Sequence, residues 1–246
     1  MATQYEQDDP RALLVSTLMN SEVADWIRQY AAPYRELMSY YRCAMMEVTT
    51  KFNVLDEELS LQYDRNPIES IKTRLKSVES ILGKMSRKNL PLTVESIEEN
   101  LCDVAGVRVI CAFPSDIYRL ADAFLRQDDV RLIKTKDYIK EPKPNGYRSL
   151  HIVVDVPVYM SHGKLFTPVE IQIRTVAMDF WATLEHGIRY KATEEVPQKI
   201  VDELRECADV ITATDYKMQE IFKVLQEVHD ADDSYQEEII PEFIQR

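Results

Sequence analysis

The segment from Pro168 to Thr175 constrains the fold of this chain more than any other. Its sequence, PVEIQIRT, alternates apolar and polar residues, and this period of two is typical of a β-strand with one buried face. The apolar positions are expected on the buried face. The opposite face then carries an acid, an amide and a guanidinium about 7 Å apart, since a strand rises about 3.3 Å per residue: Glu170, Gln172 and Arg174.

The residues after this strand help to decide whether its polar face binds a ligand or is only solvated. A helix-like run with large apolar residues begins at Val176. The polar side chains therefore approach a strand-to-helix junction, where open α/β sheets tend to bind ligands. The alternative for any short motif of this kind is a one-sided strand with a solvated polar face. The helical context favours the binding face.

The rest of the chain predicts an α/β fold, a mixed β-sheet flanked by helices, with helical extensions at both ends. Apolar runs predict strands over 102–113, 130–137, 149–156 and 165–174. Apolar residues spaced by three and four predict helices over 20–65, 68–88, 114–127, 175–190 and 197–229. Pro33 predicts a break, or the start of a second helix, within the first of these.

Basic residues are concentrated in one short segment of an acidic protein. The formal net charge is −12, which argues against nucleic-acid binding over the whole surface. Residues 69–88 carry six basic and two acidic residues, whereas residues 202–246 carry thirteen acidic and four basic ones. The basic segment predicts an anion site, with a solvated helix face as the alternative. On the predicted helix, polar side chains suited to phosphate oxygens fall on or beside one row: Arg74, Ser77, Ser80, Lys84, Arg87 and Lys88.

Two carboxylates stand at predicted strand ends, Asp103 and Glu170. Two carboxylates together with substrate phosphates are the usual way in which proteins hold Mg²⁺. Arg108 lies inside the first apolar strand, where a charged side chain needs either a salt-bridge partner or a ligand. Both alternatives remain open from the local sequence.

A loop over 140–148 combines positive charge with an aromatic ring. Pro142, Pro144 and the Asn145-Gly146 pair predict turns. Lys143 and Tyr147 could hold phosphates and stack a base, and the alternative is a solvated hairpin loop. The sequence contains no P-loop, GxGxxG or kinase signature, so phosphoryl chemistry here would use a different fold.

Hydropathy and cysteine spacing indicate a cytoplasmic protein. The first ten residues are polar and acidic, and no run of about 18 apolar residues occurs. The four cysteines are widely spaced without a CxxC pair, which favours buried free thiols over disulfides or a zinc site.

Several of these stretches, taken in order, resemble the small alarmone synthetases, the synthetase-only relatives of the RelA/SpoT enzymes, with the RelQ type as the nearest pattern. The resemblance covers roughly 67–191 and rests on RLKSVESIL from Arg74, DVAGVR from Asp103, DYI from Asp137, NGYRSLH from Asn145, EIQIRT from Glu170 and MDFWATLEH from Met178. It implies a nucleotidyltransferase-like fold. It also implies transfer of the β,γ-pyrophosphate of ATP to the ribose 3′-hydroxyl of GTP or GDP, with AMP and pppGpp or ppGpp as products.

Roles for individual residues follow from the resemblance. Two acids would hold Mg²⁺, and the second would also orient or deprotonate the attacking hydroxyl: Asp103 and Glu170. The donor-side residues would sandwich adenine or lie near the ATP phosphates: Arg74, Arg108, Ser80, Lys84 and Arg87. The acceptor-side residues would stack on guanine or surround the acceptor nucleotide: Tyr147, Lys143, His151, Gln172 and Arg174.

The resemblance also bears on organisation and regulation. It implies an N-terminal helical segment over 1–66, a catalytic domain over 67–191 and a C-terminal acidic helix and tail over 192–246. It further implies a homotetramer, with single-stranded RNA as a candidate regulator and no membrane partner. Hydrolase and regulatory signatures of the larger family members are missing from this sequence, which predicts synthesis without hydrolysis. Departures from the RelQ pattern weaken the expectation of activation by pppGpp: Arg42, Met46, Thr49 and Asp179.

Two other functions are compatible with the same residues. A catalytically silent nucleotide or single-stranded RNA binding module would use the basic segment and the Tyr147 loop. A template-independent nucleotidyltransferase would keep the fold and the metal but release pyrophosphate. Two acids at metal-holding positions favour an enzyme, because acids in a simple anion site would repel the ligand.

Overall fold

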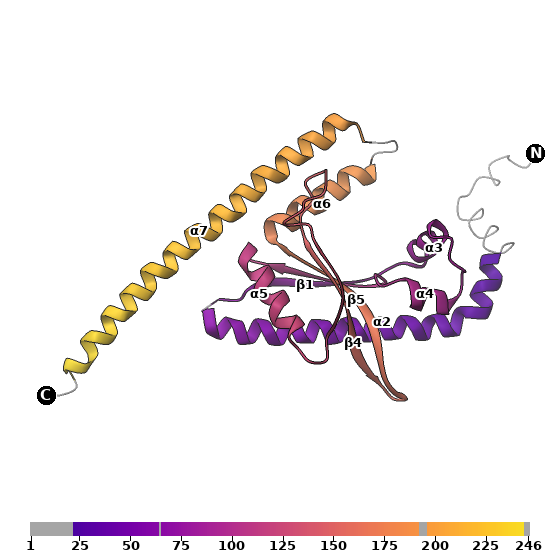
Figure 1. Cartoon of the computed structure of the whole chain (residues 1–246), viewed down its shortest axis with the longest axis horizontal. Helices are drawn as coiled ribbons and strands as arrows, with labels where there is room; N and C mark the ends of the chain where they lie inside the picture. Colours follow the sequence, from indigo (N-terminus) through magenta and orange to yellow (C-terminus); the bar gives the residue numbers. More distant parts are fainter. Residues whose placement is uncertain (1–21, 64, 192–195, 244–246) are drawn as a thin grey trace, which may run out of the picture.

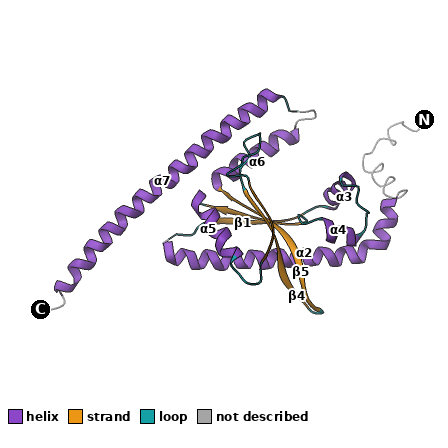
Figure 2. Ribbon diagram, in the orientation of Figure 1, coloured by secondary structure: helices purple, strands orange, loops and turns teal. Residues whose placement is uncertain are grey.

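A five-stranded mixed β-sheet forms the centre of the molecule (Figures 1 and 2). The computed structural model describes residues 22–63, 65–191 and 196–243. The strands are β1 (Ile68–Leu75), β2 (Ala105–Cys111), β3 (Arg131–Asp137), β4 (Leu150–Met160) and β5 (Gly163–Thr175). Their order is β1-β2-β5-β4-β3, in which β2 and β5 are parallel and all other neighbours antiparallel. The predicted fold class is confirmed.

Helices cover the sheet on both sides. They are α2 (Glu22–Tyr63), α3 (Val78–Arg87), α4 (Val94–Asn100), α5 (Pro114–Leu125), α6 (Val176–Lys191) and α7 (Gln198–Phe243). Figure 1 shows α2 running along one side of the sheet, while α6 and the long α7 lie on the other. None of the helices in the described ranges combines the length and apolar character that a membrane crossing requires. The outer ends of the predicted terminal segments, 1–21 and 244–246, lie outside the described residues.

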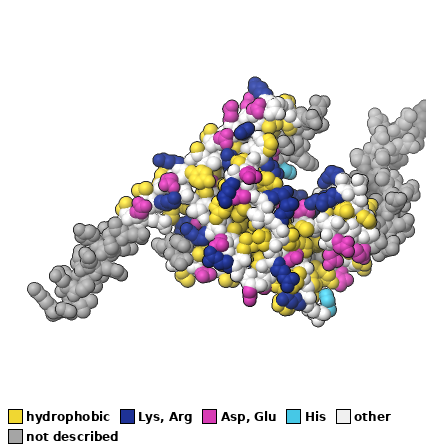
Figure 3. Space-filling view, viewed as in Figure 1, with side chains coloured by type: hydrophobic (Ala, Val, Ile, Leu, Met, Phe, Trp, Pro, Cys, Tyr) yellow, Lys and Arg dark blue, Asp and Glu magenta, His cyan; other side chains and the backbone are white. Residues whose placement is uncertain are grey.

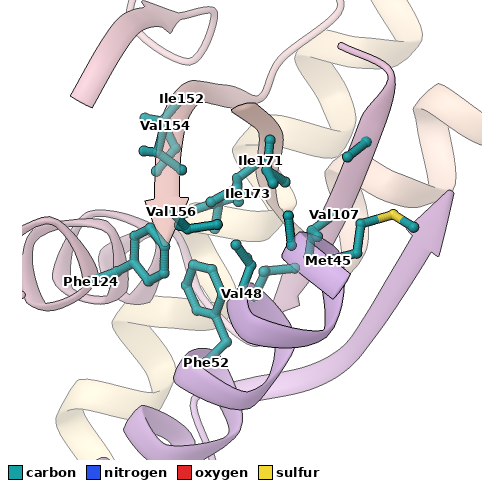
Figure 4. Close-up of a cluster of buried hydrophobic side chains, with 14 of the residues drawn as sticks. Met45, Val48, Phe52, Val107, Phe124, Ile152, Val154, Val156, Ile171 and Ile173 are labelled. Carbon is teal, nitrogen blue, oxygen red and sulfur yellow. The ribbon is translucent and has the colours of Figure 1, made fainter. Parts of the chain in front are cut away.

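The main core lies between α2, α5 and one face of the sheet (Figure 4). The strand residues that alternate toward this face are fully or nearly fully buried, as are the helix residues that meet them: Ile152, Val154, Val156, Ile171, Ile173, Met45, Val48 and Phe52. The rings of Phe52 and Phe124 stack with their centroids 4.6 Å apart. Since side chains alternate along a strand, the other residues of β4 and β5 face away from this core.

The predicted helix over 68–88 is wrong in its first half. Ile68–Leu75 form the edge strand β1, and only Val78–Arg87 form a helix. Antiparallel pairing with β2 runs along the whole of β1, so tertiary hydrogen bonding outweighs the helical spacing of its apolar residues. Ser77 then begins α3 by accepting a hydrogen bond from the backbone N–H of Ser80. Arg74 therefore lies on a strand and not on the helix that carries Lys84.

Other boundaries also differ from prediction. The helix α2 continues through Pro33, which is exposed, so the carbonyl left without its N–H partner can meet water. The acidic helix extends beyond 229 to Phe243, and the short helix α4, capped by Thr93, was not predicted. All four cysteines are free, as predicted, but only Cys111 is buried; Cys43 and Cys102 are half-buried and Cys207 is exposed.

Candidate active site

The sheet face opposite the main core carries a row of polar side chains across four strands. The pairing register places Lys72 of β1 beside Arg108 of β2, and Arg108 beside Gln172 of β5. The same register continues from Gln172 to His151 of β4. Residues paired across strands point to the same face, so these four side chains share one surface.

A second row, two residues along the strands, brings the two predicted acids together. Gly106 of β2 pairs with Arg74 on one side and with Glu170 on the other. Asp103, just before β2, lines the same cavity of about 270 Å³ as Glu170. Gly106 lines this cavity as well, and its missing side chain leaves the space above β2 open.

Asp103 is held by two lysines through a single oxygen. Lys76 Nζ lies 2.5 Å and Lys84 Nζ 2.6 Å from Oδ2, whereas the buried Oδ1 has no hydrogen-bond partner among the described residues. Burial raises the pKa of this carboxyl, but the two lysines outweigh burial and the pKa lies below its usual value. Asp103 is therefore ionised at neutral pH, and one of its oxygens is buried without a hydrogen-bond partner among the described residues.

A chain of contacts leads from Glu170 to the loop between β3 and β4. Glu170 Oε1 lies 3.7 Å from His151 Nδ1, and His151 Nε2 lies 2.8 Å from the Tyr147 hydroxyl. Arg174 donates to that hydroxyl at 2.8 Å, so the hydroxyl proton is directed to Nε2 and the imidazole proton is left on Nδ1, facing Glu170. The interaction with His151 is the largest cause that lowers the pKa of Glu170, against burial, which raises it.

Asp179 of α6 joins this chain to Arg108. Its Oδ1 accepts from Arg174 and from Arg108, both at 3.2 Å, and its Oδ2 accepts from Lys72 at 3.3 Å. Arg174 is only 3% exposed; burial lowers its pKa and the charge of Arg108 acts in the same direction. The carboxylate thus offsets the repulsion between two guanidinium groups. Arg108 has both a salt-bridge partner and a place in the cavities, so the two alternatives for it are not exclusive.

A second cavity of about 680 Å³ adjoins the first, and Arg74, Arg108 and Gln172 line both. Further residues that the sequence singled out line the larger cavity: Lys143, Tyr147, His151 and Arg174. Figure 3 shows lysine and arginine side chains gathered around the notch between the parts of the molecule that contain α6 and α3. The site is therefore a pair of joined, basic cavities with two acids in the smaller one.

The loop between β3 and β4 contributes an aromatic ring with cations beside it. Lys143 Nζ lies 4.7 Å and the Arg174 guanidinium carbon 5.3 Å from the centre of the Tyr147 ring. Burial raises the pKa of the Tyr147 hydroxyl, although Arg174 acts against burial. The loop is thus part of the cavity wall, and the solvated-hairpin alternative does not describe it.

The residues predicted on α3 are placed less uniformly. Lys84 reaches the site through its ion pair with Asp103. Ser80 and Arg87 are not among the residues that line the two cavities. Ser80 instead donates its backbone N–H to the capping hydroxyl of Ser77 and accepts from that hydroxyl. Arg87 is exposed.

Comparison with known proteins identifies the family. A model of the region found in RelA / SpoT proteins matches residues 73–195. The GTP pyrophosphokinase YwaC of Bacillus subtilis (strain 168) is 43% identical over 199 residues, which are 81% of this chain and 95% of YwaC. The crystal structure of small alarmone synthetase 1 from Bacillus subtilis bound to its product pppGpp aligns with a TM-score of 0.71 and 36% identity, over 79% of this chain and 98% of that one. The chain belongs to the small alarmone synthetases of the RelA/SpoT family.

A further solved structure bears on the donor side of the synthetase. Small alarmone synthetase 1 from Bacillus subtilis bound to AMPCPP aligns with a TM-score of 0.66 and 32% identity, over 80% of this chain and 99% of that one. An adenine nucleotide and a guanine nucleotide product are thus both bound by one protein of the same fold.

The acids of the synthetase fit a divalent cation. Asp103 has a buried oxygen without a partner among the described residues, and Glu170 lines the same cavity. Within the described ranges, no group of three or more His, Cys, Asp or Glu side chains is arranged to hold a metal. A cation here would have two protein carboxylates and would take its other oxygens from phosphates and water, which is the arrangement Mg²⁺ prefers.

Asp179 is a site residue of the synthetase that the sequence did not identify as such, and Lys72 and Lys76, which contact Asp179 and Asp103, are two more. The available signal was an acid in a helical run next to Met178, Phe180 and Trp181. A buried acid in an apolar run requires a partner, but sequence spacing alone did not indicate which cations it would meet.

Proposed function

We propose that this synthetase transfers the β,γ-pyrophosphate group of ATP to the ribose 3′-hydroxyl of GTP or GDP. The 3′-oxygen attacks the β-phosphorus, the bond between that phosphorus and the oxygen bridging to the α-phosphorus breaks, and AMP leaves with the bridging oxygen. The products are AMP and pppGpp or ppGpp. The observation that carries the proposal is that Asp103 and Glu170 line one cavity, which adjoins a larger basic cavity containing Tyr147.

Glu170 is the group we assign to the attacking hydroxyl. Its lowered pKa keeps the carboxylate ionised at neutral pH, so it can accept a hydrogen bond from the 3′-hydroxyl and then its proton. Gln172 donates a hydrogen bond to the carboxylate at 3.2 Å, and His151 lies 3.7 Å from its other oxygen; these two neighbours orient it. The Tyr147 hydroxyl in turn fixes the orientation of the imidazole.

Asp103 and Glu170 are the proposed ligands of Mg²⁺. When bound, the cation supplies neutralisation of the phosphate charge as the pyrophosphoryl group moves. Asp103 would contribute Oδ1, since Lys76 and Lys84 occupy Oδ2. These two lysines also place positive charge at the edge of the cavity where phosphates would lie.

Donor and acceptor nucleotides are assigned to the two sides of these acids. Arg74 and Arg108 would sandwich adenine, a cation–π contact worth about 0.5–2 kcal/mol for each guanidinium. Residues of α3 would lie near the ATP phosphates: Ser80, Lys84 and Arg87. The acceptor would stack its guanine on the ring of Tyr147, with polar and basic groups around it: Lys143, His151, Gln172 and Arg174.

Product identification tests the reaction. The purified chain is incubated with ATP, Mg²⁺ and either GTP or GDP, and the nucleotides are separated and weighed by mass spectrometry. We expect AMP and a guanosine nucleotide heavier by one pyrophosphate. Release of free pyrophosphate with AMP transfer would instead identify a nucleotidyltransferase, and unchanged nucleotides would contradict the proposal.

Glu170→Gln tests the role of the acid. The amide keeps the shape but cannot accept the hydroxyl proton or hold Mg²⁺ well, so we expect a loss of kcat of at least about 10²-fold. Binding of GDP, measured by calorimetry without ATP, should change little. If the chain were instead a silent RNA-binding module, neither the wild type nor Glu170→Gln would make product. Both would bind RNA equally, with an affinity that falls as salt rises.

Assembly into a homotetramer is part of the proposal. Large apolar side chains of α6 and α7 are exposed in the single chain, and a partner subunit would cover them: Phe180, Leu184, Val210, Met218, Ile221, Val224, Leu225 and Val228. Synthesis without hydrolysis, a cytoplasmic location and single-stranded RNA as a regulator stay predictions from the sequence. Incubation of purified pppGpp with the chain, without ATP, tests for hydrolysis.

A further inference from the structure

The turn beside Tyr147 lies directly on the surface of α7. Gly146 is buried and has a φ of +90°, a backbone conformation that favours glycine. A Cβ at this position would lie 2.5 Å from the Cβ of Ala208 and 3.2 Å from the Cα of Arg205. The close approach therefore needs a residue without a side chain in the loop and a small residue on the helix.

Polar contacts fasten the same loop to the two C-terminal helices. Arg148 pairs with Asp209 of α7 at 3.0 Å and lies 3.5 Å from the carbonyl oxygen of Ala208. Asn145 donates to Glu185 of α6 at 2.9 Å. The residues on both sides of Tyr147 are thus tied to helices that lie outside the sheet.

Tyr147 itself packs on a small apolar cluster between these helices. The cluster is separate from the main core and contains Trp181, Ala182 and Ala208, with Leu204 packed against it. The loop that carries Tyr147 therefore lines the cavity on one side. On its other side it packs against residues of α6 and α7. A shift of α7 would therefore move Leu204 and Ala208, which are part of the surface on which Tyr147 packs.

The first half of α7 is anchored to the rest of the fold at three levels. The indole of Trp181 donates to the carbonyl of Leu204 at 2.9 Å. Further along the helix, Asp215 accepts from the hydroxyl of Thr175, the last residue of β5, at 2.6 Å. Gln219 accepts from the backbone N–H of Ser115, at the start of α5, at 2.8 Å. Figure 1 shows α7 lying beside α6 along this stretch.

We propose that the first half of α7, through Ala208, is a positioning element for the acceptor nucleotide. It holds the loop of Lys143 and Tyr147 in place, and so sets the affinity for the guanine nucleotide through that loop; the start of α7 also reaches the larger cavity at Val201. The inference rests on the proposed function, in which Tyr147 stacks on guanine. The family match ends at residue 195, and the catalytic domain predicted from the sequence ends at 191. Both end before α7 begins, so we infer that the catalytic domain must include the first half of α7 to hold the loop.

Ala208→Leu tests the proposal in the full-length protein. The added side chain would displace the Gly146 turn and move Tyr147, and a misplacement of about 1 Å can cost up to about 10²-fold. We expect the KM for GTP, and the Kd for GDP measured by calorimetry without ATP, to rise at least about tenfold. The KM for ATP should stay within about twofold, because Arg74 and Arg108 lie on β1 and β2 and not on the loop.

Ala213→Leu is the matched control, since Ala213 is exposed on the same helix and receives the same side chain. It should leave both KM values unchanged. The inference would be overturned if Ala208→Leu kept the KM for GTP of the wild type. It would also be overturned if the KM for GTP and the KM for ATP rose equally. Failure of the wild-type protein to make product would instead contradict the proposed function, which separates the two.

The same contact can be tested from the loop. Gly146→Ala should raise the KM for GTP, because its Cβ would meet Ala208 and because alanine is strained at a φ of +90°. Adding Ala208→Gly removes the nearest atom and leaves the backbone strain in place. We expect the double variant to recover at least about threefold of the lost affinity, as contacting residues couple in such cycles. No recovery would contradict a direct contact with α7, and this cycle also decides the matter if Ala208→Leu does not fold.

Discussion

A single buried carboxylate joins the residues that we propose for the two nucleotides. Asp179 of α6 accepts hydrogen bonds from Lys72, Arg108 and Arg174, which come from three different strands. Three cations around one acid leave the local charge positive, which suits a site for nucleotide phosphates. The same acid allows two guanidinium groups, assigned to different nucleotides, to lie close together.

Asp179→Ala is expected to destabilise the protein strongly. The substitution leaves Arg174 buried without its carboxylate, and breaking a buried ion pair costs about 3–5 kcal/mol. The free energy of unfolding from urea titration should fall by about 3 kcal/mol, with the contacts of Arg174 to Tyr147 and Gln172 offsetting part of the loss.

Asp209→Ala is the matched control for Asp179→Ala. Asp209 also pairs with an arginine, but its side chain is 58% exposed, so its loss should cost less than about 1 kcal/mol. Equal losses for the two variants would show that the Asp179 network contributes no more than a surface ion pair.

At the scale of elements, α7 docks through polar side chains that are themselves buried. Asp215 is 7% exposed, and burial raises its pKa although the hydroxyl of Thr175 acts against burial. A carboxyl whose pKa is higher in the folded than in the unfolded state stabilises the fold at low pH. That stabilisation is lost as the pH rises through the folded-state pKa.

Asp215→Asn should reduce this pH dependence. The amide can still accept from Thr175 but does not ionise, so stability should decline less between pH 4, near the ordinary aspartate pKa of about 3.9, and pH 7. Urea unfolding at several pH values measures the slope. Asp202→Asn, at an exposed position of the same helix, should leave the wild-type profile unchanged; a wild-type profile in Asp215→Asn would contradict the assignment.

Local periodicity predicted some elements and failed at others. The strand from Pro168 was predicted because strict alternation of apolar and polar residues is typical of a half-buried strand and does not fit a helix. The first half of 68–88 was taken for a helix because Ile71 and Leu75 are four residues apart. As an edge strand, β1 pairs only with β2 in the described sheet, and half of its residues are exposed, so its sequence carries a weak alternation.

For the whole molecule, the exposed apolar face of α7 predicts association. Val224 and Leu225 are 58% and 60% exposed in the single chain. A lysine at either position would place a charge in an interface with a partner subunit and should lower the molar mass measured by light scattering. Circular dichroism should be unchanged, because neither side chain is buried within the chain.

Glu206→Lys is the control for association, since it places the same side chain at an exposed polar position of α7. It should leave the molar mass unchanged. A wild-type protein that is monomeric at micromolar concentration would contradict the homotetramer.

The sequence by itself determined the fold class, the strand with Glu170, the loop with Tyr147 and the family. These features depend on residues close together in the chain, where spacing and turn chemistry act directly. It also placed Asp103 at a strand end, which suggested that the two acids could meet.

Only the tertiary structure decided which distant residues share the site. The network of Asp179 depends on the register of three strands, and the contact of Gly146 with Ala208 joins positions 62 apart in the sequence. Such contacts arise when packing of the core brings elements together. A sequence pattern indicates which secondary structure a segment favours but not which segments it will pack against. For that reason the contact of α7 with the loop of Tyr147 could not be predicted from the sequence alone.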